Sequence, residues 1–206
     1  MPTEERLTSP MNTAGSAAFP RFAVPRGTRA DHVEADTFKA VMGAFPTGVT
    51  VVTTTDSQGF PCGFTCSAAC SVSQDPPLLL ICADSGSRVL REITERGRFV
   101  VNFLRSDRGW VSALFASKRP DRFTSIEWRP SRRHGLPWLS ADTIAHAECE
   151  VAATVEAGDH VVVIGTILDG DVLSEPDGPL MYWRRQYAGW PTEDAVTAGL
   201  TMATEG

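Results

Sequence analysis

The hydrophobic and polar positions of the chain fall into short blocks, and the first of these blocks predict a β-hairpin. Residues 49–55 (VTVVTTT) are β-branched at every position, which favours a strand. The following DSQG at 56–59 is typical of a turn, and residues 60–68 again have strand character. A continuous apolar run at 78–82 then predicts a strand that is buried on both faces.

A helix is predicted just before this hairpin. Asp31 and Glu34 have the spacing of a capping box, the apolar residues that follow share one helical face, and Gly43 would end the helix. A start at Asp36 with Thr37 is the alternative, and it would shorten the helix without removing it.

The middle of the chain alternates between helix and strand. Residues 87–96 have apolar side chains at helical spacing and stop at Gly97, a residue favoured at helix ends. Residues 99–104 predict a strand, and 110–116 predict another short helix.

The second half of the chain is mostly strand. Residues 144–157 and 160–168 are rich in β-branched residues, and Gly158-Asp159 between them is a two-residue hairpin turn. A last short strand is expected at 180–183. Many antiparallel strands with a few short helices predict a mainly β fold, in the form of a closed or nearly closed barrel.

Three segments of different composition define the expected domain organisation. Residues 1–30 carry several prolines and glycines without an apolar period, so we expect a disordered N-terminal tail. Residues 31–190 form the single folded domain, and 191–206 are expected to be a flexible C-terminal tail.

Composition narrows the function classes. The 25 acidic and 19 basic residues give a net charge of −6, which argues against nonspecific nucleic-acid binding. The N-terminus has no signal-peptide pattern, and no apolar stretch is long enough to span a membrane. With five cysteines, an odd number, we expect reduced thiols and a cytoplasmic protein.

Several familiar site motifs are missing. The chain has no G-x-G-x-x-G, no G-x-x-x-x-G-K and no G-x-S-x-G. Cys62, Cys66 and Cys70 are spaced by four residues without a C-x-x-C pair, so we expect small apolar side chains on one side of a strand and no metal site.

Four segments remain as candidates for chemistry. FPTGV at 45–49 turns a helix end into a strand, and GFTCSAACSVSQDPP at 63–77 contains small residues that would make a flat floor for a planar ring. Gly86, Ser87 and Arg88 stand at a helix start, where amides and a guanidinium favour a phosphate. The fourth is the AGDH turn at 157–160 with the later run MYWRRQY at 181–187. A purely structural role remains open for each segment taken alone: a connection, a loop with local caps, a solvated arginine and an exposed histidine.

Taken in order, the four segments resemble the flavin reductase family of two-component monooxygenases, over residues 38–190. The resemblance implies an FMN-binding split β-barrel that works as a homodimer. It also implies that FAD or FMN is reduced by hydride transfer from NADH or NADPH, and that the reduced flavin passes to a partner monooxygenase.

The resemblance also implies roles for particular residues. The ring and ribityl chain would lie on the small-residue stretch, with Thr47 and Gly48 near the ring edge, and Gly86, Ser87 and Arg88 would take the flavin phosphate. His160 would contact the nicotinamide cofactor as an orienting group, and Tyr182, Arg185 and Tyr187 would close that pocket. The residues of the small-residue stretch are Thr65, Cys66, Ser67, Ala68, Ala69 and Ser71.

The chain departs from the family pattern at two places. The family usually has asparagine where Cys66 or Ser67 falls, and glycine between Tyr182 and Tyr187. Two other functions use the same barrel: an oxidase with permanently bound flavin, of the pyridoxamine phosphate oxidase type, and a non-enzymatic flavin or haem carrier.

Overall fold

The computed structural model describes residues 19–24, 32–173 and 178–190, and strands dominate it. The strands are β1 (Arg21–Ala23), β2 (Thr47–Gly48), β3 (Thr50–Thr55), β4 (Pro61–Cys66), β5 (Ala69–Ser73), β6 (Leu78–Asp84), β7 (Arg98–Leu104), β8 (Arg129–Pro130), β9 (Pro137–Trp138), β10 (Thr143–Ala157), β11 (His160–Val172), β12 (Leu180–Trp183) and β13 (Gln186–Gly189). The helices are α1 (Ala35–Gly43), α2 (Arg88–Arg96), α3 (Gly109–Ala116) and the 3₁₀ helix η2 (Arg122–Ser125). The expectation of a mainly β fold with a few short helices is confirmed.

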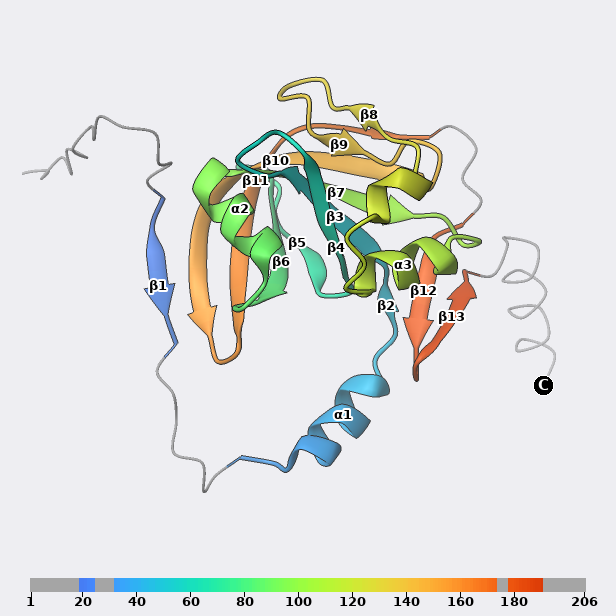
Figure 1. Cartoon of the computed structure of the whole chain (residues 1–206). Coiled ribbons are helices and arrows are strands. Elements are labelled where there is room, and N and C mark those ends of the chain that lie inside the picture. The colour runs from blue at the N-terminus through green and yellow to red at the C-terminus, as the bar shows by residue number, and fades with distance from the viewer. Residues whose placement is uncertain (1–18, 25–31, 174–177, 191–206) are drawn as a thin grey trace, which may run out of the picture.

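The largest sheet curls until its two edges come together. Its strand order is β4-β3-β7-β10-β11-β6-β5, and the two strands at the ends of this order are joined in the chain by Ser67 and Ala68 alone. The amide N–H of Cys82 in β6 donates to the carbonyl of Ala68, 3.0 Å away. No ladder joins β4 to β5 or β6 in the described residues, so the barrel is nearly closed but not continuous. Figure 1 shows this curved sheet with α2 and α3 in front of it.

Two apolar clusters hold the structure together. The larger lies within the curl and packs Ile81, Phe99 and Val163, all fully buried, against α2 through Ile93. The second lies under α3, where Phe115 packs with apolar residues of β3, β7 and β12. This second cluster connects the β12–β13 hairpin to the main sheet.

The expected hairpins and helix ends are largely present. β3 and β4 pair from Thr50↔Cys66 to Thr55↔Pro61, and β10 and β11 turn at Gly158-Asp159 with Ala157 opposite His160. Because Gly158 has φ 68°, this turn needs a residue that tolerates the left-handed region. The second helix has Ser87 as N-cap and Gly97, with φ 70°, as C-cap.

Other expectations need correction. The predicted strand 60–68 ends at Cys66, and a new strand, β5, starts at Ala69. The chain after Trp183 forms a further strand, β13, which we did not predict. Within the expected tail 1–30, Arg21–Ala23 form β1, which pairs in parallel with β10. Residues 1–18, 25–30 and 191–206 lie outside the described residues.

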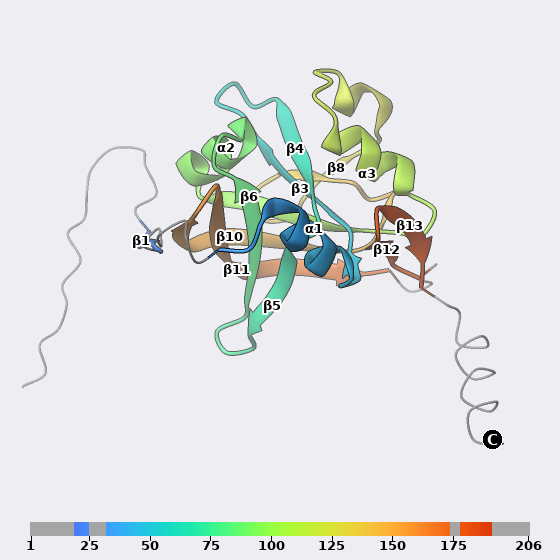
Figure 2. The same ribbon diagram turned by 90° about the horizontal axis from the view of Figure 1, so that it is seen from below.

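The first helix differs most from its prediction. Glu34 is its N-cap and makes no capping hydrogen bond, so the capping box is wrong; Asp31 lies outside the described residues. No residue of α1 is buried, and Val41 on it is 64% exposed. Figure 1 shows the helix standing away from the sheet, below β5 and β6, and in Figure 2, which is seen from below, it lies in front of the strands.

Candidate functional site

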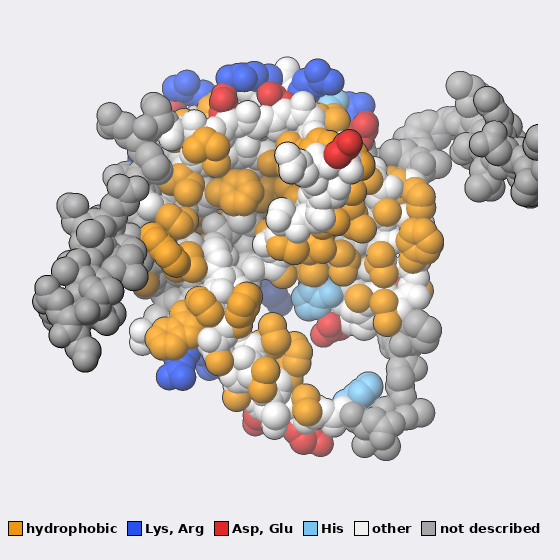
Figure 3. Space-filling model, turned by 180° about the vertical axis from the view of Figure 1, so that it is seen from behind, with side chains coloured by type: hydrophobic (Ala, Val, Ile, Leu, Met, Phe, Trp, Pro, Cys, Tyr) orange, Lys and Arg blue, Asp and Glu red, His pale blue; other side chains and the backbone are white. Residues whose placement is uncertain are grey.

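A cavity of about 760 Å³ lies between α1, the β4–β5 connection and the turn between β12 and β13. Its volume is within the range of small-molecule sites, ~300–1,000 Å³. Figure 3 shows the back of the molecule, where hydrophobic side chains gather around a hollow between the lower lobe and the body. The lining residues are Phe38, Lys39, Met42, Gly43, Phe45, Pro46, Thr47, Gly48, Ser67, Ala68, Ala69, Cys70, Leu80, Tyr182, Trp183, Arg184 and Arg185.

The floor of this cavity is built where the chain crosses from one edge of the sheet to the other. Ser67, Ala68 and Cys70 are exposed to the cavity side, and Ala69 is half-buried. Since none of these side chains is large, a flat ligand can approach the backbone closely. The bond from Cys82 N–H to Ala68 fixes the crossing against β6. The prediction of a small-residue floor therefore fits the geometry.

The rim of the cavity comes from two elements distant in sequence. Thr47 and Gly48 pair with Tyr182 and Met181 in a small antiparallel ladder. The indole N–H of Trp183 donates to the carbonyl of Ala44, 3.1 Å away, at the end of α1. The structure thus brings Thr47 and Gly48 together with Tyr182 and Arg185, as the sequence predicted.

The charges around the cavity are of one sign. Lys39, Arg184 and Arg185 line it, and no Asp or Glu is among its described lining residues. Lys39 pairs with Asp36, but both side chains are largely exposed, so this pair screens little. In a chain of net charge −6, a cavity with only cations favours an anionic ligand.

The predicted phosphate position lies at the start of α2, outside the lining of this cavity. Ser87 caps the helix by accepting from Leu90 N–H at 3.4 Å. Gly86 N–H donates to Asp84 Oδ1 at 2.8 Å, so a carboxylate of the chain already holds one of the expected donors. Arg88 is 67% exposed and lies 3.9 Å from Asp56. A phosphate bound here would have to displace Asp84 from Gly86.

His160 lies beside the phosphate position. It pairs with Asp84 in the β6–β11 ladder, and Ser85 N–H donates to the carbonyl of Asp159 at 3.0 Å. His160 Nδ1 is 2.8 Å from Asp159 Oδ1, and this hydrogen bond lowers the pKa of the Asp159 carboxyl. The turn after β6 and the β10–β11 turn are therefore adjacent, which the sequence analysis did not predict.

Besides Gly86–Arg88 and His160, four other predicted residues do not line the cavity. Cys66 is 4% exposed in the larger core cluster with Sγ 3.5 Å from the Cys82 carbonyl, and burial raises its pKa, so its side chain cannot contact a ligand in the cavity. Thr65 Oγ1 donates to the carbonyl of Ser112 at 2.6 Å. Ser71 lines an adjoining, apolar cavity of about 450 Å³ instead.

The fourth is Tyr187. Its hydroxyl is 2.9 Å from the Ser112 hydroxyl, and its ring centroid is 5.2 Å from that of Tyr182. Tyr187 therefore supports Tyr182, which does line the cavity, rather than lining it itself.

Sequence analysis missed several lining residues. Phe38 and Met42 were assigned to one face of the first helix, and Phe45 to the segment FPTGV without a role of its own. All three are exposed and line the cavity. Cys70 was assigned to the same buried side as Cys62 and Cys66, but it lies in β5 and is exposed. A signal was present for Cys70, because the small residues on both sides of it are not the composition of a buried strand.

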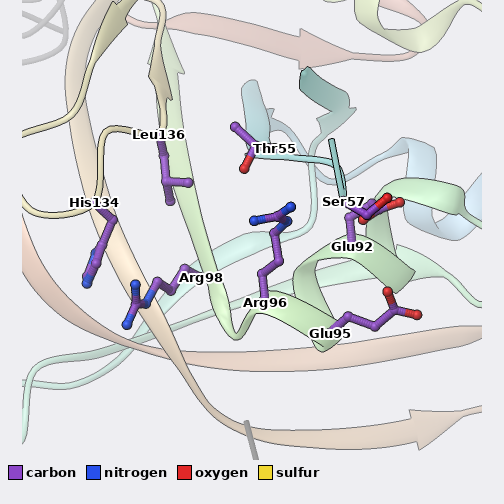
Figure 4. Close-up of a pocket in the computed structure, with 8 residues that line it drawn as sticks. All are labelled: Thr55, Ser57, Glu92, Glu95, Arg96, Arg98, His134 and Leu136. Carbon is purple, nitrogen blue, oxygen red and sulfur yellow. The ribbon is translucent and has the colours of Figure 1, made fainter. Parts of the chain in front are cut away.

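A second cavity of about 490 Å³ lies beyond α2, lined by Thr55, Ser57, Glu92, Glu95, Arg96, Arg98, His134 and Leu136. Figure 4 shows Arg98 beside His134, Arg96 between them and α2, and Glu95 pointing away. Each of these nitrogen-bearing side chains has a partner in the chain. Arg96 donates to the Asp56 carbonyl, Arg98 is 3.7 Å from Glu150, and His134 Nδ1 is 2.9 Å from the fully buried Glu148.

The fold and the first cavity define a mainly β ligand-binding domain with a flat floor and an anion-favouring rim. The flavin reductase like domain matches residues 42–191 of the chain. The chain is 55% identical over 175 residues to flavin reductase (NADH) of Kitasatospora aureofaciens, covering 84% of this chain and 92% of that protein. The chain therefore belongs to the flavin reductase like domain family, and the resemblance drawn from the four segments is confirmed.

Two further similarities agree with this assignment. The chain is 40% identical over 162 residues to flavin reductase (NADPH) of Lentzea aerocolonigenes, covering 79% of this chain and 94% of that protein. The crystal structure of nitrilotriacetate monooxygenase component B from Mycobacterium thermoresistibile has a TM-score of 0.72 and 39% identity, covering 76% of this chain and 86% of that one.

Proposed function

We propose that the protein is an NAD(P)H-dependent flavin reductase that reduces free FAD or FMN and supplies the reduced flavin to a separate monooxygenase component. The observation that carries the proposal is the cavity over Ser67–Ala69, which combines a flat floor of small residues with a rim whose charges are all positive. Two of the relatives are flavin reductases named for NADH and NADPH respectively, so both nicotinamides are candidates.

A flavin fits the cavity by shape and charge. Its planar ring needs a floor without large side chains, and Ser67, Ala68 and Ala69 provide one. Thr47 and Gly48 would lie at the ring edge, and backbone groups of the β4–β5 connection would bond the ring's polar atoms. The flavin phosphate would reach Gly86, Ser87 and Arg88, where Arg88 supplies the charge.

The chemistry of the reaction belongs to the two substrates, since a hydride passes directly between the nicotinamide and flavin rings. The task of the protein is to hold both rings stacked and to exclude water. Phe38, Met42 and Phe45 supply the apolar cover on the α1 side of the cavity. His160, held by Asp159, would orient the nicotinamide substrate and balance its charge.

A homodimer is part of the proposal, and its support comes from α1. This helix has nine residues and buries none of them, although isolated helices of this length are unstable in water. Val33, Phe38, Val41 and Phe45 are each 59–65% exposed. A second copy of the chain that covers α1 would remove this apolar surface from water and would close the cavity from outside.

The dimer has a direct test. Val41→Glu places a charge on the exposed face of α1 without altering a cavity-lining residue, and we expect it to give a monomer of 22.3 kDa in sedimentation. Phe60→Glu is the matched control, because Phe60 is 62% exposed at the β3–β4 turn, and it should leave the dimer intact. A wild-type protein that sediments as a monomer at micromolar concentration would overturn the dimer.

The partner and the cellular location complete the proposal. One similar solved structure is component B of nitrilotriacetate monooxygenase, which supports an oxygenase as recipient of the reduced flavin. All five cysteines are free, in line with a reducing cytoplasm. No helix in the described part of the chain is long and apolar enough to cross a membrane.

One steady-state experiment tests the activity. FAD and FMN are each combined with NADH and with NADPH, and oxidation of the nicotinamide is followed by its loss of absorbance. We expect turnover only when free flavin is added. An oxidase would instead purify with tightly held flavin and a carrier would show no turnover, so either result would overturn the proposal.

A further inference from the structure

The turn between β12 and β13 has an unfavourable backbone for the residues it contains. Trp183 pairs with Gln186, which leaves Arg184 and Arg185 as a two-residue loop. Both have positive φ, 47° for Arg184 and 66° for Arg185. A loop with two such residues normally contains Asn or Gly, because a side chain with a Cβ is strained in the left-handed region.

The strain is specific to this turn. Arg184 and Arg185 are the only non-glycine residues with positive φ among those the structure describes. Glycine at either position would relax the loop, so two arginines here lower the stability of the folded chain. Backbone strain of this kind is concentrated at functional sites, where the strained residue contributes to function although it lowers stability.

The turn is also firmly placed. Tyr182 and Tyr187 pair across the hairpin, and the Trp183 indole bonds to Ala44 at the end of α1. The guanidinium of Arg184 lies over the Trp183 ring, 4.6 Å from its centroid. The backbone of the turn is therefore fixed at the rim of the cavity, and the side chain of Arg184 is held by Trp183.

Neither guanidinium has an acidic partner. Across the described residues no ion pair or hydrogen bond joins the side chain of Arg184 or Arg185 to another group, and no carboxylate lines the cavity. This contrasts with Arg96 and Arg98, whose side chains meet acceptors of the chain itself. Two adjacent, unpaired guanidiniums form a binding site for phosphate oxygens.

We propose that Arg184 and Arg185 form a phosphate subsite for the dinucleotide that donates the hydride. The inference rests on the proposed function and deepens it. The position that we propose for the flavin phosphate is Gly86–Arg88, and none of those residues lines the cavity that contains the arginine turn. The arginine turn is therefore available to the second substrate, NADH or NADPH. Its diphosphate is negatively charged, whereas its reduced nicotinamide ring is neutral.

The test compares two variants of Arg185 with a matched control. Arg185→Gln removes the charge and keeps the strain, whereas Arg185→Gly removes both. Arg129→Gln is the control, because Arg129 is an exposed arginine of β8 that does not line the cavity. Four quantities are measured: the KM for NADH or NADPH, inhibition by ADP-ribose, the KM for FMN and FAD, and Tm. ADP-ribose has the diphosphate but no nicotinamide ring.

We expect Arg185→Gln to raise the nicotinamide KM and the inhibition constant of ADP-ribose about tenfold each, the scale of one charge-assisted hydrogen bond, with kcat and both flavin KM values unchanged. Arg185→Gly should show the same losses with a Tm about 2–4 °C higher, because the strain is relieved. Arg129→Gln should match the wild type.

Other outcomes overturn the inference. These are unchanged nicotinamide KM, no inhibition of the wild type by ADP-ribose, or no gain in Tm for Arg185→Gly. A loss confined to FAD would assign the subsite to the flavin diphosphate and would overturn the assignment to the nicotinamide substrate. If the wild type oxidises neither nicotinamide with either flavin, the proposed function fails instead, and ADP-ribose binding by calorimetry still tests the subsite.

Discussion

The two cavities contain similar cations but differ in what surrounds them. In the cavity beyond α2, Arg96, Arg98 and His134 each meet an acceptor supplied by the chain, and Glu92 and Glu95 line the same space. In the cavity over Ser67–Ala69, Arg184 and Arg185 meet none among the described residues. The cavity over Ser67–Ala69 also has a floor of small side chains and a partly apolar rim.

The contacts of the positively charged side chains distinguish a ligand site from a polar hollow on the surface. In the cavity beyond α2, Arg96 and Arg98 contact groups of the chain itself, and His134 Nδ1 lies 2.9 Å from the buried Glu148. A ligand there would compete with contacts already made, and exposed ion pairs of this kind contribute little energy to either state. In the cavity over Ser67–Ala69, the charges of Arg184 and Arg185 and the exposed apolar side chains are available to interact with a ligand or with a second copy of the chain.

The largest expected effect comes from filling the floor. Ala68→Phe adds a ring where the flavin would lie, and because Ala68 is exposed the fold should be unaffected. We expect flavin-dependent turnover to fall by at least about a hundredfold, the equivalent of roughly 2.7 kcal/mol or more. Ser57→Phe, in the cavity beyond α2, should keep wild-type turnover and is the control. Equal loss in both variants would contradict the distinction between the cavities.

The next effect concerns the flavin phosphate. Arg88→Ala should weaken FMN and FAD binding by roughly tenfold to a hundredfold, as expected for a charge-assisted hydrogen bond, while riboflavin binding changes little. Arg98→Ala removes an arginine of similar exposure from the cavity beyond α2 and should change none of the three. Titration of each flavin measures the effect. An equal loss for riboflavin would mean that Arg88 supports the fold instead.

The smallest expected effect has the opposite sign. Asp84 accepts from Gly86 N–H at the place proposed for the phosphate, so its negative charge opposes the ligand. Asp84→Asn keeps an acceptor for the turn and removes the charge, and we expect FMN to bind several-fold more tightly, roughly 1 kcal/mol, with riboflavin unchanged. Weaker binding of FMN to this variant would show that Asp84 forms part of the site.

The fold could be predicted from sequence where one physical signal dominates. The β-branched run that forms β3, the Gly158-Asp159 turn and the Gly97 helix end all depend on local preferences of the backbone. The position of α1 could not be predicted, because its apolar residues do not pack into the core and no residue of the helix is buried. The strand β1 is too short to have a periodic pattern of its own.

The candidate site was predicted in its parts but not in its packing. The small residues of the stretch 65–71 indicated a floor, and Ser67, Ala68 and Ala69 of the predicted residues line the cavity, whereas Thr65, Cys66 and Ser71 do not. The inward direction of Cys66 depends on where β4 ends, and the contact between Asp84 and Gly86 depends on one side-chain rotamer. Neither can be read from spacing.

The most direct test of the central claim, that flavin binds on the Ser67–Cys70 floor, is protection of a thiol. Cys70 is exposed and lines the cavity, whereas burial raises the pKa of Cys62 to about 11 and that of Cys149 to about 12, so these two serve as unreactive internal controls at pH 8. The rate of Cys70 alkylation is measured by mass spectrometry with and without saturating FMN.

Bound flavin covers the floor in this account, so FMN should slow Cys70 alkylation at least about tenfold, and Ala68→Phe should abolish the protection by FMN. An alkylation rate of Cys70 that is the same with and without FMN, under conditions where FMN binds, would contradict the placement of flavin on this floor.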